Sequence, residues 1–168
     1  MKDVTIHKWY VLLFGIELKV PLWRLVIHDF RKFHPKNFIP YTQRFFGDSY
    51  DEDEFEYVWL DHQNTCQHHW EYWITRSSNA KSPGADGFIV AIPLRMPMWA
   101  VREMVADWLA ASKAYAGIEV TSLTSWVWYQ KNYPNIQKHL HEDTVTVLAN
   151  VLVDYLLGRS TKHVNNTT

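Results

Sequence analysis

Cysteine is almost absent from this sequence, which holds one, Cys66, in 168 residues. A single thiol cannot form an internal disulfide, and it is too few for a zinc site built from thiolates. The sequence therefore excludes a disulfide-stapled scaffold and favours a reducing compartment, so we expect a cytoplasmic protein.

An excess of charge of either sign is also missing. The 17 basic residues are matched by 18 acidic ones, which gives a formal net charge of -1. No basic stripe of the kind that follows a nucleic-acid backbone can be found. We therefore expect a small-molecule substrate and no nucleic-acid polymer as partner.

The sequence lacks a long uninterrupted hydrophobic run. The apolar stretch from Trp9 to Ile16 is followed directly by Glu17 and then by Lys19. Such charges are costly at the centre of a bilayer, and no small-residue cleavage site follows the stretch. We expect neither a spanning helix nor a secretory signal, and no membrane partner.

What the chain does contain is the composition of a globular protein. Hydrophobic residues make up 47% and aromatic residues 15%, including 9 tryptophans. A chain of this length fits one domain with a real core. We expect a single domain over residues 1–158, followed by a disordered polar tail over residues 159–168.

Helical signals dominate the pattern along the chain. We expect helices over residues 4–18, 21–32, 35–46, 55–62, 97–115, 126–133 and 142–157, with one or two further turns at 68–74. Pro21 and Pro35 suit a first helical turn, and Gly117 suits a helix end. Residues 88–94 alternate and predict a short strand or an irregular loop. The fold class is all-α, with an irregular loop or short strand near residues 76–96.

The histidines lie close to acidic residues. These residues come from separate predicted elements: His7, His28, Asp29, His62, His68, His69 and Asp107. Imidazoles and carboxylates are the ligands that divalent Mn, Fe, Co and Zn accept, and Mg binds carboxylates. Neighbours on a helix differ by about 100°, so His28 and Asp29 could reach two sides of a metal, or a metal and its neighbour. One carboxylate can bridge two ions, so we expect two divalent ions.

The order of these residues resembles the HD-domain superfamily of metal-dependent phosphohydrolases. A histidine comes first, then a His-Asp pair, then further histidines, then a lone aspartate on a later helix. The segments HDFRKFHPKNF, HQNTCQHHWEYW and MPMWAVREMVADWLAASKAYAG are similar to an uncharacterised family of phage and bacterial proteins, over residues 7–133. The resemblance implies an HD-like metal-binding domain folded as an orthogonal helical bundle, in the host cytoplasm if a phage encodes it.

The resemblance also implies the ligand sets. The first metal would be bound by four side chains, with Asp29 bridging: His7, His28, Asp29 and Asp107. The second would be bound by His62 together with His68, His69 or both. Lys32 matches the lysine of the HDxxK segment found in the cyclic-dinucleotide phosphodiesterases called HD-GYP. The GYP triplet itself is absent, and Trp70 to Trp73 stand where its glycine-rich loop would follow.

Further residues are candidates for catalysis beside Asp29 and Lys32. Glu103 lies four residues before Asp107 and shares its helical face, so it could support a ligand, poise a water or lie on a solvated surface. Lys32, Arg102 and Lys113 are candidates for phosphate contacts, although a surface ion pair suits Arg102 better. The tryptophans suit a core, and one or two of them could stack on a base.

We expect a metal-dependent phosphohydrolase that acts on a nucleotide or cyclic (di)nucleotide, as a phosphomonoesterase or phosphodiesterase. Two alternatives stay open. Some HD-fold proteins use similar residues to hold two irons for oxygen-dependent cleavage, so an HD-type di-iron oxygenase is one of them. The other is a non-catalytic phage protein that binds or sequesters a nucleotide.

Overall fold

The computed structural model describes residues 2–76 and 91–165, and the side chains of residues 5–44, 47–75 and 91–159. Residues 77–90, which form most of the predicted irregular loop or short strand near residues 76–96, lie outside these ranges. None of the helices in the described ranges combines the length and the hydropathy that a bilayer-spanning segment needs.

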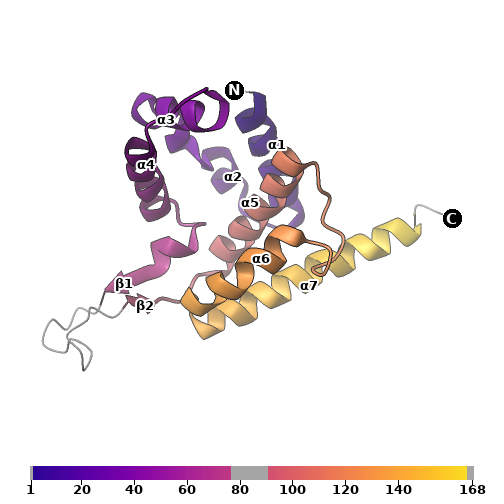
Figure 1. The fold of residues 1–168 in the computed structure, drawn as a ribbon. Coiled ribbons are helices and arrows are strands. Elements are labelled where there is room, and N and C mark those ends of the chain that lie inside the picture. The colour runs from indigo at the N-terminus through magenta and orange to yellow at the C-terminus, as the bar shows by residue number, and fades with distance from the viewer. Residues whose placement is uncertain (1, 77–90, 166–168) are drawn as a thin grey trace, which may run out of the picture.

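The described residues form an all-α fold with one small hairpin, which confirms the predicted fold class (Figure 1). The helices are α1 (Lys2–Glu17), α2 (Leu22–Ile27), α3 (Pro35–Phe46), α4 (Glu52–Thr65), α5 (Met98–Ala116), α6 (Val127–Ile136) and α7 (Glu142–Asn165). Three 3-10 helices cover Phe30–Phe33, Trp70–Trp73 and Gln137–His139. Strand β1 (Ile74–Arg76) pairs antiparallel with β2 (Ala91–Pro93), with Thr75 opposite Ile92.

Helix α5 is the centre of the hydrophobic core. Its small residues Ala100, Ala106 and Ala110 are fully buried, which lets α1 and α7 approach closely. The core residues of these two neighbours are Val11 and Phe14 on α1, with Leu18 directly after it, and Leu148, Val151, Leu152 and Tyr155 on α7. Gly117 ends α5 in the left-handed conformation, as the sequence predicts.

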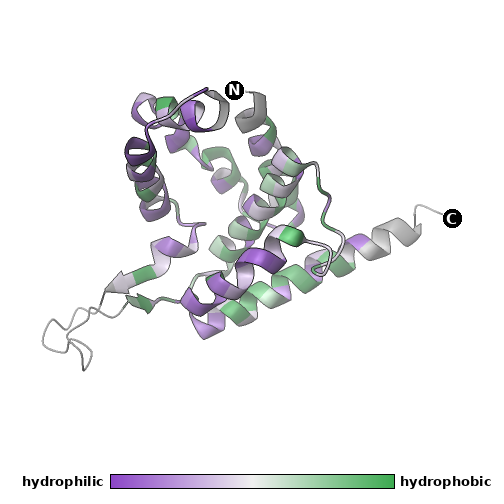
Figure 2. Cartoon of the chain, viewed as in Figure 1, coloured by the Kyte–Doolittle hydropathy of each residue, from purple (hydrophilic) through white to green (hydrophobic). Residues whose placement is uncertain are grey.

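Helices α3 and α4 form a separate layer. They pack on each other, on the 3-10 helix Phe30–Phe33 and on the 3-10 helix Trp70–Trp73. None of their described residues belongs to the main core cluster. Figure 2 shows α4 as mostly hydrophilic, whereas α5 and α7 carry long hydrophobic stretches. Asp51 begins α4 by accepting a hydrogen bond from the Glu54 backbone N–H at 2.9 Å.

The second helix is shorter than the sequence predicts. It ends at Ile27 rather than continuing to residue 32, and His28 (φ -51°, ψ 126°) and Asp29 (φ 56°, ψ 18°) form a turn close to type II. Aspartate tolerates the left-handed conformation better than most residues. The interpretation that a 100° helical offset spreads the His28 and Asp29 side chains is therefore wrong, because a tight turn does so.

The last helix is longer than predicted. It continues past residue 157 to Asn165, so the predicted tail begins as helix, and residues 166–168 lie outside the described ranges. Arg159 forms ion pairs with Glu119 at 2.9 Å and with Glu17 at 3.6 Å. These pairs tie the extended part of α7 to α1 and to the segment after α5.

Gly15 marks the closest approach between α1 and α2. A Cβ at this position would lie 2.3 Å from Leu25 Cδ2, whereas a Cβ at Gly158 on α7 would meet nothing within 4 Å. We expect Gly15→Ala to lower the free energy of unfolding by about 1–2 kcal/mol, because overpacking against buried Leu25 outweighs the gain in helix propensity. Gly158→Ala, the matched control, should raise it by up to about 1 kcal/mol. Urea unfolding of both variants measures the difference, and equal midpoints would contradict the close packing.

Candidate metal centre

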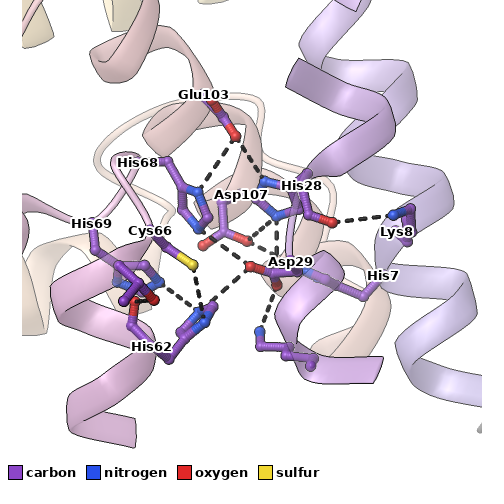
Figure 3. A network of polar contacts seen from close by, with 12 residues as sticks. His7, Lys8, His28, Asp29, His62, Cys66, His68, His69, Glu103 and Asp107 are labelled. Carbon is purple, nitrogen blue, oxygen red and sulfur yellow. Dashed lines mark hydrogen bonds and ion pairs between the residues drawn. The ribbon is translucent and has the colours of Figure 1, made fainter. Parts of the chain in front are cut away.

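The predicted ligand residues converge from five segments of the chain (Figure 3). His7 lies on α1, His28 and Asp29 in the turn after α2, His62 on α4, His68 and His69 in the following loop, and Asp107 on α5. Most of these side chains are buried: the residue exposures are 4% for His7, 2% for His28 and 7% for Asp29. Buried polar groups from separate elements do not gather without a reason, because each loses its hydration.

Four side chains form a first ligand group. Asp107 Oδ1 lies 3.0 Å from His7 Nε2 and 3.4 Å from His28 Nε2. His28 Nε2 lies 3.6 Å from Asp29 Oδ2. One ligand atom from each of the four residues lies within 4.8 Å of the others. This is the group that the family resemblance of the sequence implies for the first metal.

Three histidines form a second group on the other side of Asp29. His62 Nε2 and His68 Nε2 each lie 3.4 Å from Asp29 Oδ1. His69 Nε2 lies 3.0 Å from His62 Nε2, so both His68 and His69 are within reach of the group. Asp29 therefore presents Oδ2 to His28 and Oδ1 to His62 and His68.

The donor atoms fit a cation. Among the described residues, His28 Nε2, His68 Nε2 and Asp29 Oδ1 are buried and have no hydrogen-bond partner. Ligands that bind Zn²⁺ at 2.0–2.2 Å lie about 2.9–3.6 Å from one another, which is the range of the separations seen here. Divalent ions bound in the two groups would satisfy these three orphaned atoms, so the buried histidines and carboxylates could hold a metal ion.

Glu103 holds two of the histidines from behind. Its Oε1 lies 3.1 Å from His28 Nδ1 and 3.4 Å from His68 Nδ1, and its Oε2 accepts a hydrogen bond from Arg24 Nε at 2.5 Å. A carboxylate on Nδ1 fixes the tautomer that leaves Nε2 free to bind a metal. Of the roles predicted for Glu103, the geometry matches support of a ligand.

Lys32 lies against the shared carboxylate. Its Nζ donates to Asp29 Oδ2 at 2.5 Å and lies 5.2 Å from the centre of the Tyr41 ring. Burial alone would lower the pKa of Lys32, but the charge of Asp29 raises it above its usual range. Lys32 therefore stays charged and orients Asp29.

The carboxylates of the cluster stay ionised. Burial alone would raise the pKa values of Asp29 and Asp107, yet both are held well below their usual range. The charges of His28 and Lys32 do this for Asp29, and the nearby His28 and His7 imidazoles do it for Asp107. Burial alone would also raise the pKa of Glu103, but its hydrogen bonds to His28 and His68 lower it.

The buried histidines of the cluster differ in their pKa values. Burial lowers the pKa of His68 to about 4, with His28 as the next cause. Burial also acts to lower the pKa of His28, but the nearby carboxylates of Asp29, Asp107 and Glu103 raise it to about 10. In the metal-free protein His28 is therefore positively charged, whereas His68 is neutral and its Nε2 can bind a cation.

These shifts predict how the stability of the metal-free protein depends on pH. The pKa of His28 rises from 6.5 to about 10 on folding, so its contribution is full below about pH 6.5 and is lost as pH rises through 10. The depressed pKa values of Asp29 and Asp107 give stability above about pH 4 that is lost as pH falls. Urea midpoints measured in chelator should therefore fall as the pH rises above about 6.5, and should also fall as the pH drops below about 4. A midpoint that stays constant from pH 7 to 10 would contradict the assignment for His28.

Two predicted phosphate contacts are not brought to the cluster. Lys113 pairs with Glu119 at 3.4 Å, and Arg102 lines a hollow with Glu17 and Tyr155. Lys113 follows Asp107 by six residues on α5, which displaces it by about 9 Å along the helix and turns it to another face. Of the predicted catalytic residues, Asp29, Lys32 and Glu103 lie together.

Two residues of the site were missed by sequence reasoning. Arg24 pairs with Glu103, and its guanidinium lies 3.8 Å from the centre of the Trp99 ring. Cys66 Sγ lies 3.2 Å from His62 Nδ1. Burial raises the pKa of the Cys66 thiol to about 12. Both residues lie four positions from a ligand histidine, a spacing that could have indicated them.

Two hollows reach the cluster. A cavity of about 460 Å³ includes His68, His69 and Asp107 in its wall. A second hollow of about 370 Å³ is lined by residues that include His28, Asp29 and Arg31. Residues of the ligand group thus line two hollows, whereas ligand atoms such as His28 Nε2 and Asp29 Oδ1 are themselves buried.

The fold and the site define an all-α protein with a buried histidine and aspartate cluster that could hold a metal ion. The chain matches DUF5662, a family of unknown function, over residues 1–154, and it belongs to this family. No curated protein and no solved structure matches the chain significantly.

Proposed function

We propose that this protein is an HD-type metal-dependent phosphohydrolase that acts on a small phosphoester through two divalent ions. The observation that carries the proposal is the position of Asp29, whose two oxygens face different ligand groups. His7, His28, Asp29 and Asp107 would bind one ion. His62, His68 and His69 would bind the other together with Asp29.

Two bound ions would lower the pKa of a coordinated water and offset negative charge on the phosphoryl oxygens. The residues of the chain prepare the site for this. Lys32 orients Asp29 through its 2.5 Å hydrogen bond and adds a positive charge that favours an anionic substrate. Glu103 keeps Nε2 of His28 and of His68 directed at the cluster.

The surroundings also support hydrolysis of a small molecule rather than of a polymer. The ligand atoms are buried, and the cavity beside them is of the size that holds a small ligand. Phosphomonoesters and phosphodiesters of nucleosides, including cyclic nucleotides, are therefore the substrates to test first.

The test begins with elemental analysis of the purified protein, followed by a screen of nucleotides and cyclic nucleotides with added Mn²⁺ or Co²⁺ under anaerobic conditions. We expect about two metal ions per chain and release of phosphate or a phosphomonoester. Bound iron with oxygen uptake, and no anaerobic turnover, would indicate the di-iron oxygenase instead. Nucleotide recovered intact from metal-loaded protein would indicate a binding module, and either result would overturn the proposal.

A further inference from the structure

The 460 Å³ cavity beside the cluster has walls of an unusual kind. Six aromatic side chains line it: Trp59, Trp70, Trp108, Tyr115, Trp126 and Trp128. Aromatic faces bind other flat rings by stacking, with little preference for the identity of the ring. The shape and chemistry of this cavity point to a planar group.

These walls are held in place by contacts of their own. Trp126 Nε1 donates a hydrogen bond to Ser112 Oγ at 2.8 Å, and Trp70 stacks on His139 with ring centres 5.4 Å apart. Trp108 and Trp128 contact each other at 5.2 Å. A cavity whose walls are already ordered loses little conformational freedom when a ligand enters. The aromatic walls thus form a preorganised site.

The charges around the cavity select the ligand further. Among the lining residues that the structure describes, there is no lysine or arginine, whereas Asp107 and Glu71 supply carboxylates. A polyphosphate placed there would meet no cation from the protein. Glu71 Oε1 accepts a hydrogen bond from Gln63 at 2.8 Å. The other oxygen, Oε2, lies 3.6 Å from His69 Nδ1 and has no hydrogen-bond partner among the described residues. A carboxylate with spare acceptor capacity favours N–H donors.

We propose that this cavity binds the neutral, planar ring of a nucleoside monophosphate, with an N–H edge of the ring toward Glu71 and the single phosphate at the cluster. The position of the phosphate rests on the proposed function, because it requires ions at His68, His69 and Asp107. The binding of the ring does not rest on it, because the ring depends on the aromatic walls and Glu71 and needs no metal ion.

The first experiment measures binding of the ring without metal. Titration calorimetry measures the binding of guanosine and of ribose 5-phosphate to the metal-free protein in chelator. We expect guanosine to bind and ribose 5-phosphate not to bind. Ala111→Trp should fill the cavity and weaken guanosine binding by at least about tenfold. Trp128→Ala, at a half-exposed position where folding is at little risk, should weaken it similarly. Trp23→Ala on α2, outside the cavity, is the matched control.

Two outcomes of this titration overturn the proposal. One is that guanosine does not bind, and the other is that both cavity variants bind it as tightly as the parent does. Glu71→Gln adds a separate readout. It should weaken the binding of guanosine but not that of purine riboside, because the purine riboside ring lacks N–H donors. Equal effects on the two nucleosides would overturn the role of Glu71.

The second experiment separates this proposal from the proposed function. Metal-loaded protein should release phosphate from guanosine monophosphate at least about tenfold more efficiently than from ribose 5-phosphate, and Ala111→Trp should remove the difference. Guanosine binding without any phosphate release would contradict the proposed function alone. Equal turnover of both esters, unchanged in Ala111→Trp, would overturn the assignment of the cavity.

Discussion

Replacing Asp29 with asparagine is expected to remove both metal binding and turnover. Asp29 is the residue that faces both ligand groups, through Oδ2 at 3.6 Å from His28 and Oδ1 at 3.4 Å from His62 and His68. An amide has nearly the same shape but lacks the negative charge that two cations require. We expect metal affinity to fall by at least about 100-fold and the rate by a similar factor, which corresponds to about 2.7 kcal/mol of barrier.

Asp61→Asn is the matched control for this variant. Asp61 pairs with Arg31 at 3.0 Å on the surface, outside both ligand groups, so its loss should change neither metal content nor rate. Metal content is measured by elemental analysis and affinity by competition with a chelator. An Asp29→Asn protein that keeps two ions and the parent's rate would refute the central role of this carboxylate.

Glu103→Gln is expected to have the second largest effect, because it acts on both metal affinity and folding. Glu103 holds His28 and His68 through Nδ1 and neutralises Arg24, and its side chain is only 2% exposed. Loss of a carboxylate behind metal-binding histidines costs about 10- to 100-fold in metal affinity. Leaving a buried arginine without its partner costs about 3–5 kcal/mol of unfolding free energy.

A double variant separates these two effects. Arg24→Met with Glu103→Met removes both charges and fills a similar volume, so stability should return close to that of the parent. Metal affinity should stay low, because His28 and His68 still lack an acceptor at Nδ1. If affinity recovered together with stability, Glu103 would be important for the fold but not for positioning the histidines.

The ligand residues were predictable because their chemistry is visible in the sequence. Histidines and aspartates are rare in a hydrophobic core, so their repeated occurrence in predicted helices indicated a shared site. The helical fold class followed from periodicity and from end signals such as Gly117, which do not depend on distant contacts.

The local geometry around those residues was less predictable. The break of α2 at His28 is imposed by contacts with α5, which lies some 75 residues later, as the pair between His28 and Glu103 shows. The four-residue spacing between Arg24 and His28 does not reveal which acid Arg24 pairs with, because Glu103 is equally distant in the sequence. The positions of Lys113 and Arg102 depend on which face of α5 meets the core, and periodicity alone left that choice open.

The separate layer formed by α3 and α4 has a consequence for how the molecule responds to metal. None of the described residues of this layer belongs to the main core, yet α4 supplies His62, whose Nε2 faces Asp29 from across the site. A cation bound there would link the α3–α4 layer to the rest of the molecule. The free concentration of the cation would then determine how often this layer separates from the rest. At low concentrations of the ion, the site would then become exposed by local opening before the rest of the protein unfolds.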